Sequence, residues 1–328
     1  DLKFPYTKMF LFEKDCPVEE YIATAKALHQ IKPFDAIVTF NDTTQEYAIK
    51  IANALELFSP VNLDTLKVVY NKQLTRDVLN KAGLDDTLFH LVESESQLRD
   101  VVTTANCKLI MKPTDSTGSS GISIINSVTD IEPALSWLKE CKCDFPVIVE
   151  SFLEGKEYSV EAISEEGEHF IFGVTEKMKD PVTFLELGHV FPAPLEKDVE
   201  EEINAFVQKS LTALGITHGA SHTEIIYTEN GPRIVESHTR AGGDKIFQLV
   251  EYTTGAKLFE LITRQAAGEK VLPELINCQP NKVAAIKFLA LGFDGQTKLV
   301  EFENLEQAKK IDGVQEIFQF KHAGDVMD

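Results

Sequence analysis

The chain has 328 residues, of which 43% are hydrophobic and 26% are charged. It is therefore long enough to bury a large core and to divide into two or three subdomains. Its formal net charge of −20 argues against nucleic acid or an anionic membrane as a partner, because both attract an exposed basic field. No apolar run reaches the roughly 18 residues that a membrane-spanning helix needs.

The cysteines indicate a reducing environment. Their number is odd and they lack a repeated C-x-x-C spacing, which is typical of free thiols in the cytoplasm, where we expect the protein to be located. The five are Cys16, Cys107, Cys141, Cys143 and Cys278.

Helix and strand patterns alternate at the N-terminus. Residues 17–31 and 43–57 have the apolar spacing of amphipathic helices, and the short apolar run at 35–40 is typical of a buried strand. This alternation predicts a parallel sheet covered by helices. A doubly wound sheet normally has one or two strands before this point, so we expect residues 1–70 to form an incomplete α/β subdomain.

The later two thirds of the chain predict a mixed α/β fold with antiparallel strands. Gly83 ends a predicted helix as a left-handed C-cap. The segment after Val283 indicates a strand, a turn, a strand, a helix and a strand. The other predicted elements are helices at 63–82, 95–105, 130–141 and 197–214, strands at 108–112, 122–126 and 147–150, further strands to residue 175, and a hairpin at 222–240.

The hairpin carries the most informative residues. A two-residue turn at Asn230-Gly231 would put Glu224 and Glu236 on opposite faces of the sheet. A three-residue loop with a left-handed Gly231 would instead bring these two residues face to face, and His222 opposite His238. Arg240 would lie on the same face.

Face-to-face carboxylates repel each other, so this second pairing makes sense with a divalent cation between Glu224 and Glu236. Carboxylate oxygens and substrate phosphates suit Mg²⁺. Two alternatives stay open: a solvent-exposed hairpin whose polar residues simply alternate outward, and a zinc site formed by His222, His238 and the two glutamates.

Two other segments have the composition of a nucleotide site. Lys112 ends an apolar strand and precedes a Gly/Ser-rich loop at 114–121, whose backbone N–H groups could contact polyphosphate. It is not a P-loop, because the G-x-x-x-x-G-K-[ST] pattern is absent. The segment from Val147 to Glu157 predicts a strand, a short connector and a second strand, and such a connector can offer backbone groups to adenine.

These segments, in this order, resemble the ATP-grasp superfamily. The adenosine-binding pattern of its D-alanine–D-alanine ligases, Glu-x-x-Leu-x-Gly-x-Glu, occurs here as Glu150-Ser-Phe-Leu153-Glu-Gly155-Lys-Glu157. The resemblance implies that Glu150 lies near the adenine amino group and that Phe152 and the Leu153 backbone lie at the adenine edge. It also implies that Glu157 binds the ribose.

The resemblance also assigns the phosphate contacts. Asn71-Lys72, with Arg76 one turn later, is similar to the family's Asp-Lys helix, so Lys72 is implied as the first phosphate lysine and Lys112 as the second. Lys177 is a further candidate. The loop that closes over the phosphates would contribute Ser119, Ser120 and Gly121.

The metal signature of the family is an acid on one strand and Glu-x-Asn-x-Arg on the next. Glu224 and Glu236 fit it as ligands of Mg²⁺, with two ions implied and Mn²⁺ able to substitute, and Arg240 matches the arginine that stabilises an acyl-phosphate. His238 stands where Asn is usual, and His222 where the ligases often carry a substrate-binding Arg. Both are candidate catalytic residues.

Two stretches are similar to the L-amino acid ligases that make dipeptides: Glu-Ser-His-Thr-Arg-Ala-Gly-Gly-Asp at 236–244 and Gly-His-Val-Phe-Pro-Ala at 188–193. His189, Gly242 and Gly243 are therefore candidate substrate contacts. The resemblance covers roughly residues 60–270. It implies an ATP-grasp domain at 71–282 with a flap subdomain at about 105–150, and a C-terminal α+β subdomain at 283–328 that stops early.

The resemblance implies a ligase that uses ATP and Mg²⁺. It would phosphorylate the carboxylate of an amino acid and couple the acyl-phosphate to an amine of a second amino acid. Its partners would be small molecules, with no nucleic acid and no membrane, and a homodimer is one option for its assembly. Two alternatives are an ATP-grasp ligase with a carrier protein or a biosynthetic intermediate as acceptor, and a zinc hydrolase.

Overall fold

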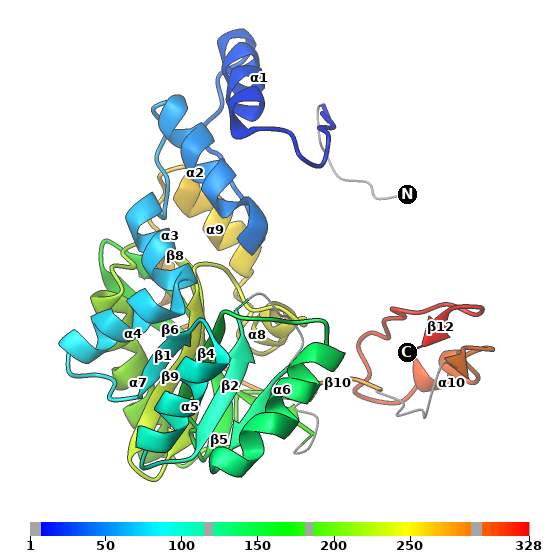
Figure 1. Ribbon diagram of the computed structural model, residues 1–328. Helices are drawn as coiled ribbons and strands as arrows, with labels where there is room; N and C mark the ends of the chain where they lie inside the picture. The colour runs from blue at the N-terminus through cyan, green and yellow to red at the C-terminus, as the bar shows by residue number, and fades with distance from the viewer. Residues whose placement is uncertain (1–7, 115–120, 181–185, 290–296, 328) are drawn as a thin grey trace. The chain divides into compact units, whose positions relative to one another are not determined.

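Figure 1 shows the computed structural model of the chain, which describes residues 8–114, 121–180, 186–289 and 297–327. The chain divides into two compact units, Asp1–Lys287 and Phe288–Asp328. Every predicted site residue belongs to the larger unit. The predicted subdomain boundaries at residues 70 and 282 stay predictions.

The larger unit begins with helices. These are α1 (Val18–Ile31), the short 3-10 helix η1 (Asp42–Thr44) and α2 (Gln45–Ala54), so the two helices predicted there are confirmed. The predicted strand at 35–40 is wrong. A strand needs a hydrogen-bonded neighbour, and no strand of the described residues pairs with this segment. The predicted parallel sheet is likewise not found, because every strand pair in the described residues is antiparallel.

The single helix predicted at 63–82 is two helices, α3 (Leu63–Tyr70) and α4 (Lys72–Lys81). Asn71 separates them because its backbone is extended and its side-chain oxygen accepts the Leu74 N–H at 3.1 Å. An N-cap of this kind begins a new helix. The break leaves Lys72 as the first residue of α4, and Gly83 after it has the predicted positive φ.

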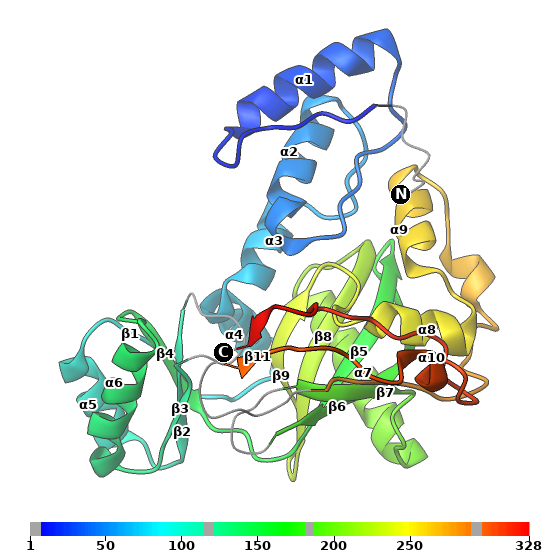
Figure 2. The same ribbon diagram turned by 90° about the vertical axis from the view of Figure 1, so that its right-hand side faces the viewer.

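A four-stranded antiparallel sheet follows, with strand order β1-β4-β2-β3. Leu98 and Leu138 of its two helices pack with Met111 in a fully buried core. Figure 2 shows both helices on the same side of the sheet. The elements are β1 (Phe89–Val92), α5 (Glu95–Thr104), β2 (Leu109–Pro113), β3 (Ser123–Ile125), η2 (Val128–Asp130), α6 (Ile131–Glu140) and β4 (Val147–Ser151).

The second sheet has six strands in the order β10-β7-β6-β5-β8-β9. Its strands are β5 (Lys156–Glu165), β6 (Glu168–Lys179), β7 (Glu186–Phe191), β8 (Gly219–Thr228), β9 (Gly231–His238) and β10 (Ala284–Lys287). Its helices are α7 (Lys197–Ala213), α8 (Ile246–Thr254), α9 (Leu258–Ala266) and η3 (Leu272–Leu275).

Residue alternation gives the central strands of this sheet one apolar and one polar face. Tyr158 and Val160 of β5 belong to the buried cluster that includes Val207 of α7. Successive side chains of a strand point to opposite faces, so Glu157 and Ser159 of β5 lie on the other face. The polar face, away from α7, is where the predicted site residues of β5, β6, β8 and β9 gather.

The smaller unit contains β11 (Thr297–Lys298), α10 (Leu305–Ala308) and β12 (Val326–Met327), and β11 pairs antiparallel with β12. With β10 before them, these elements follow the order predicted for the segment after Val283. Every helix in the described residues is too short or too polar to cross a bilayer.

Candidate functional site

The hairpin of β8 and β9 brings the two predicted metal-binding glutamates face to face. Glu224 pairs with Glu236, and His222 with His238. The prediction of a three-residue loop needs a correction, because pairing already resumes at Thr228 and Gly231, and Gly231 has the expected positive φ. A β-bulge next to Glu224 then shifts the register by one residue. Bulges commonly aim side chains beside active sites, and this one sets the pairing of the carboxylates.

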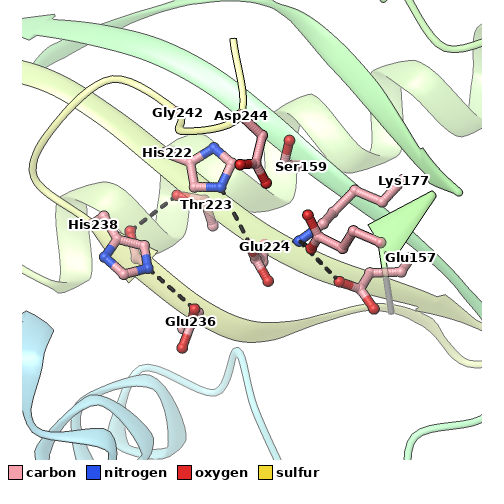
Figure 3. A network of polar contacts seen from close by, with 12 residues as sticks. Glu157, Ser159, Lys177, His222, Thr223, Glu224, Glu236, His238, Gly242 and Asp244 are labelled. Atoms are coloured by element: carbon pink, nitrogen blue, oxygen red, sulfur yellow. Dashed lines mark hydrogen bonds and ion pairs between the residues drawn. The ribbon is translucent and has the colours of Figure 1, made fainter. Parts of the chain in front are cut away.

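Glu224 lies between a histidine and a lysine (Figure 3). Its Oε1 atom is 3.3 Å from His222 Nε2 and accepts a hydrogen bond from Lys177 Nζ at 2.5 Å. Burial raises the pKa of Glu224, but the hydrogen bond from His222 and the Lys177 ammonium outweigh it and hold the pKa well below its usual range. Glu224 is therefore an ionised carboxylate at neutral pH.

Glu236 has its own pair of partners. Its Oε1 atom is 3.1 Å from His238 Nε2, and its Oε2 atom is 3.3 Å from Lys72 Nζ. Burial opposes ionisation, but the hydrogen bond from His238, aided by the Lys72 charge, lowers the pKa of Glu236 to about 2 although Glu224 repels it. Lys72 thus contacts one of the paired carboxylates, and its phosphate contact stays a prediction.

Lys177 is surrounded by carboxylates. Its Nζ atom lies 3.2 Å from Glu157 and 2.8 Å from Glu186, in addition to Glu224. Burial lowers the pKa of Lys177, but these three carboxylates raise it well above its usual value. The lysine is thus a fixed cation beside the hairpin, and its ammonium lies where Glu157, Glu186 and Glu224 converge.

A buried carboxylate holds His222 from behind. Glu161, which is 1% exposed, accepts from His222 Nδ1 at 2.5 Å, from the Gly242 N–H at 3.1 Å and from Ser159 Oγ at 3.2 Å. Burial lowers the pKa of His222, but Glu161, followed by Glu224, raises it to about 10. His222 is therefore an imidazolium that donates to a carboxylate from each nitrogen.

The two adjacent glycines predicted to contact substrate differ in their surroundings. A Cβ atom at Gly242 would lie 2.8 Å from Glu161 Oε2 and 2.9 Å from His222 Nδ1, whereas a Cβ at Gly243 would meet nothing within 4 Å. We therefore expect Gly242→Ala to lower the free energy of unfolding by about 1–3 kcal/mol and Gly243→Ala to leave it nearly unchanged. Denaturant titration of both variants tests this. Equal unfolding midpoints would show that the side chains of Glu161 and His222 can move aside without loss of stability.

The predicted adenosine segment lies between the two sheets. Glu150 at the end of β4 is 5% exposed, and its carboxylate binds Lys112 Nζ and lies 3.2 Å from Arg76 Nη2. Phe152 and Leu153 follow in the connector to β5, where the Phe152 ring lies under the Lys108 ammonium at 4.1 Å. The predicted contacts of Glu150, Phe152 and Leu153 with adenine stay predictions.

Arg240 and His238 meet a carboxylate that the sequence did not single out. Asp42 Oδ2 accepts from Arg240 Nε at 2.5 Å, and Asp42 Oδ1 is 3.5 Å from His238 Nδ1. Burial raises the pKa of Asp42, but the nearby His238, together with hydrogen bonds from Tyr70 and Arg240, outweighs it and holds the pKa well below its usual range. His238 at the end of β9 and Arg240 just after it, both predicted to be catalytic, therefore share one anion from η1.

His189 is wholly buried on β7, opposite Lys177. Its Nε2 atom is 3.5 Å from Glu186 and 3.7 Å from Asp244. The structure thus brings His189 close to the hairpin through Lys177 and Glu186, although its predicted contact with substrate stays a prediction. Gly121 has a positive φ, and the other two predicted loop residues, Ser119 and Ser120, lie outside the described residues.

Four acidic residues of the site escaped the sequence analysis: Asp42, Glu161, Glu186 and Asp244. Signals existed for two of them. Glu161 continues the alternation of Glu157 and Ser159 with apolar residues on β5, and Asp244 ends the stretch at 236–244 that is similar to the L-amino acid ligases. In the described residues, the groups of three ligand atoms within 4.8 Å of one another are Glu157–Glu186–Glu224 and Glu186–His189–Asp244. The His/Glu quartet of the hairpin is not such a group, which weighs against a tetrahedral zinc site.

Comparison with known proteins gives a family and several relatives. Residues 105–248 match the family model described as ATP-grasp domain. Alanine–anticapsin ligase of Bacillus subtilis (strain 168) is 25% identical over 269 residues, which are 75% of this chain and 57% of that protein. Dapdiamide A synthase of Enterobacter agglomerans is 23% identical over 312 residues, 91% of this chain and 73% of that protein. This chain spans only 57–61% of the length of several curated relatives it matches.

The solved structures show the same fold. The crystal structure of an L-amino acid ligase from Bacillus licheniformis superposes with a TM-score of 0.79 at 22% identity, covering 94% of this chain and 75% of that one. A phosphoribosylglycinamide synthetase from Anaerococcus prevotii superposes with a TM-score of 0.67, also at 22% identity, covering 93% and 76%. Residues 105–248 thus match an ATP-grasp domain, and the likeness to these solved structures shows that the chain has their fold, the ATP-grasp fold that its motifs predicted.

Proposed function

We propose that the protein is an ATP-dependent ligase that activates the carboxylate of one amino acid and joins it to the amine of another. The observation that carries the proposal is the face-to-face pair of ionised carboxylates, Glu224 and Glu236, with Lys72 and Lys177 beside them. The relatives named as ligases and synthases support it.

The residues of the hairpin fit a divalent metal. Glu224 and Glu236 are ionised and oppose each other across a bulge, and such a pair is stable only with cations nearby. They would hold Mg²⁺, or Mn²⁺ in its place, as one or two ions. A bound metal would neutralise charge on the β- and γ-phosphates of ATP.

Three cationic side chains would bind the phosphates of ATP and the acyl-phosphate. Lys72 and Lys112 extend from two different elements towards the carboxylates of Glu236 and Glu150, so they are oriented before any nucleotide binds. The substrate carboxylate attacks the γ-phosphorus and forms an acyl-phosphate and ADP. Arg240 then holds the acyl-phosphate through its planar fork of donors.

The second half of the reaction needs an amine close to the acyl carbon. The amine attacks that carbon, the C–N bond forms and inorganic phosphate leaves. His189 lies beside Glu186, a partner of Lys177, and the Gly242 N–H donates to Glu161 behind His222. With the adjacent Gly243, these residues are our candidates for the amino-acid contacts. Exclusion of water protects the acyl-phosphate from hydrolysis.

The test is ADP formation by the purified protein with single amino acids and with pairs, followed by mass spectrometry of the products. We expect ADP release that requires both an amino acid and Mg²⁺, and a dipeptide mass from a matching pair. Release with one amino acid but no dipeptide with any pair would favour a different acceptor. ADP release that no amino acid stimulates would contradict the proposal.

A further inference from the structure

A short segment far from the ATP-grasp motifs contacts three successive residues at the end of β9. This segment is η1 and the first residue of α2, 42–45. It reaches His238 and Arg240 through Asp42, and Thr239 through Gln45. The two ends of these contacts are 194 to 198 residues apart in sequence.

The two carboxylate oxygens of Asp42 contact different side chains. Oδ2 accepts the Arg240 Nε–H at 2.5 Å, while Oδ1 accepts from Tyr70 Oη at 2.5 Å and faces His238 Nδ1 at 3.5 Å. The opposite nitrogen of His238, Nε2, lies against Glu236. One carboxylate therefore binds the arginine and also lies beside the histidine that contacts a proposed metal ligand.

The segment that carries Asp42 is itself held in place. Asn41 Oδ1 accepts the Thr43 N–H at 2.9 Å and so fixes the turn. Gln45, which is 3% exposed, donates to the Thr239 carbonyl at 3.2 Å and accepts from Thr239 Oγ1 at 2.5 Å. This paired contact ties the backbone just after β9 to the start of α2, next to η1.

We propose that Asp42 is a positioning residue for catalysis, which fixes the guanidinium plane of Arg240 and the ring of His238. The proposal rests on the proposed ligase function, since Arg240 is the group that would stabilise the acyl-phosphate. A guanidinium is rigid and planar, so a carboxylate on Nε sets the direction in which its terminal nitrogens point. Residues that orient functional groups in this way are needed for a site to keep its productive geometry.

The geometry also explains why a carboxylate is used here. Arg240 donates through Nη1 to the Ala241 carbonyl at 2.9 Å, so with Asp42 on Nε two sides of the guanidinium are fixed by the protein. A neutral amide at position 42 could accept from Arg240, but it would turn a donor towards either His238 or Arg240. Asp42→Asn therefore tests orientation while changing the size of the side chain little.

The experiment compares Asp42→Asn and Asp42→Glu with Asp35→Asn, an exposed aspartate seven residues earlier. We expect Asp42→Asn to lower kcat for amino-acid-dependent ADP formation about 10- to 100-fold, the usual effect of removing an orienting partner. KM for ATP should stay within about twofold, because a contact made only in the transition state changes kcat and kcat/KM together. Asp42→Glu restores the charge and should recover most of the rate, and Asp35→Asn should equal the wild type.

Crystal structures of the wild type and of Asp42→Asn give a readout that needs no activity. We expect the guanidinium of Arg240 to leave its present orientation in the variant. An unmoved Arg240, or a variant with wild-type kcat, overturns the positioning role. A wild-type protein that forms no amino-acid-dependent ADP overturns the ligase function instead, so the two failures are distinct.

Melting temperatures separate a loss of rate from a loss of folded protein. If Asp42→Asn does not fold, Tyr70→Phe provides the test, because it removes only the hydroxyl that holds Asp42 Oδ1. A severalfold fall in kcat at unchanged KM for ATP supports the proposal, and an unchanged kcat overturns it.

Discussion

Glu236→Gln is expected to reduce amino-acid-dependent ADP formation by more than about 100-fold, since even residues that only support metal ligands typically contribute 10- to 100-fold. The substitution keeps the shape of the side chain but removes one of the two charges that would hold the metal. The residual activity should require a higher Mg²⁺ or Mn²⁺ concentration than the wild type. Steady-state ADP formation over a range of metal concentrations measures both effects.

The matched control is Glu176→Gln. Glu176 also forms a salt bridge, at 2.5 Å to Lys156, and its side chain is 16% exposed. It directly precedes Lys177 on β6, so it points to the opposite face of the sheet. If Glu176→Gln has wild-type activity and Glu236→Gln does not, the loss of activity comes from removing a carboxylate on the polar face of the sheet. Full activity of Glu236→Gln at low metal concentration would exclude Glu236 as a metal ligand.

The sequence could predict the pairing of Glu224 with Glu236 because this pairing depends on residues that are close together in the chain. The alternation on either side of Glu229-Asn230-Gly231 and the turn residues themselves limit the register to two choices. It could not predict where the extra residue lies. The left-handed Gly231 was expected to set the register at the turn, whereas the structure shifts it at the bulge beside Glu224. The two arrangements pair the same glutamates, so the pattern of side chains does not distinguish them.

The sequence could not predict the contacts made across long separations. Asp42 meets Arg240, and Glu161 meets His222, over 198 and 61 residues respectively, and no local periodicity connects such pairs. The predicted strand at 35–40 failed for a related reason. Its apolar residues were expected to be buried, whereas Ile37 and Val38 are half-buried and Phe40 is exposed. Val38 packs against a side-chain cluster instead of joining a sheet. Burial is visible in a short pattern, whereas a hydrogen-bonding neighbour is not.

Arg76→Met is expected to lower the free energy of unfolding by about 3–5 kcal/mol, the usual effect of removing one member of a buried ion-pair network. Arg76 is 6% exposed, lies 2.5 Å from Asp85 and 3.2 Å from Glu150, and donates to the Ile234 carbonyl. Methionine fills much of the same volume but leaves the carboxylates without this cation. Urea titration at neutral pH measures the effect.

Arg99→Met is the comparison that isolates burial. Arg99 also contacts two carboxylates, Glu95 and Glu132, but its side chain is 43% exposed, and exposed ion pairs contribute little because water and salt screen them. We expect its urea midpoint to match the wild type. If Arg76→Met has a urea midpoint as high as that of Arg99→Met, the prediction is wrong. Water would then solvate the carboxylates of Asp85 and Glu150 in the variant.

The stability that Arg76→Met loses should also depend on pH, in a direction that follows from the pKa of Glu150. Burial raises the pKa of Glu150, but Lys112 and then Arg76 outweigh it and lower the pKa. Ionised Glu150 therefore adds stability above the ordinary carboxyl range, and this contribution is lost as the pH falls through its folded-state pKa. Without Arg76 the buried Glu150 protonates more readily. The difference in the free energy of unfolding between the wild type and Arg76→Met should thus become smaller as the pH is lowered. A difference that does not change with pH would assign the loss to packing instead of charge.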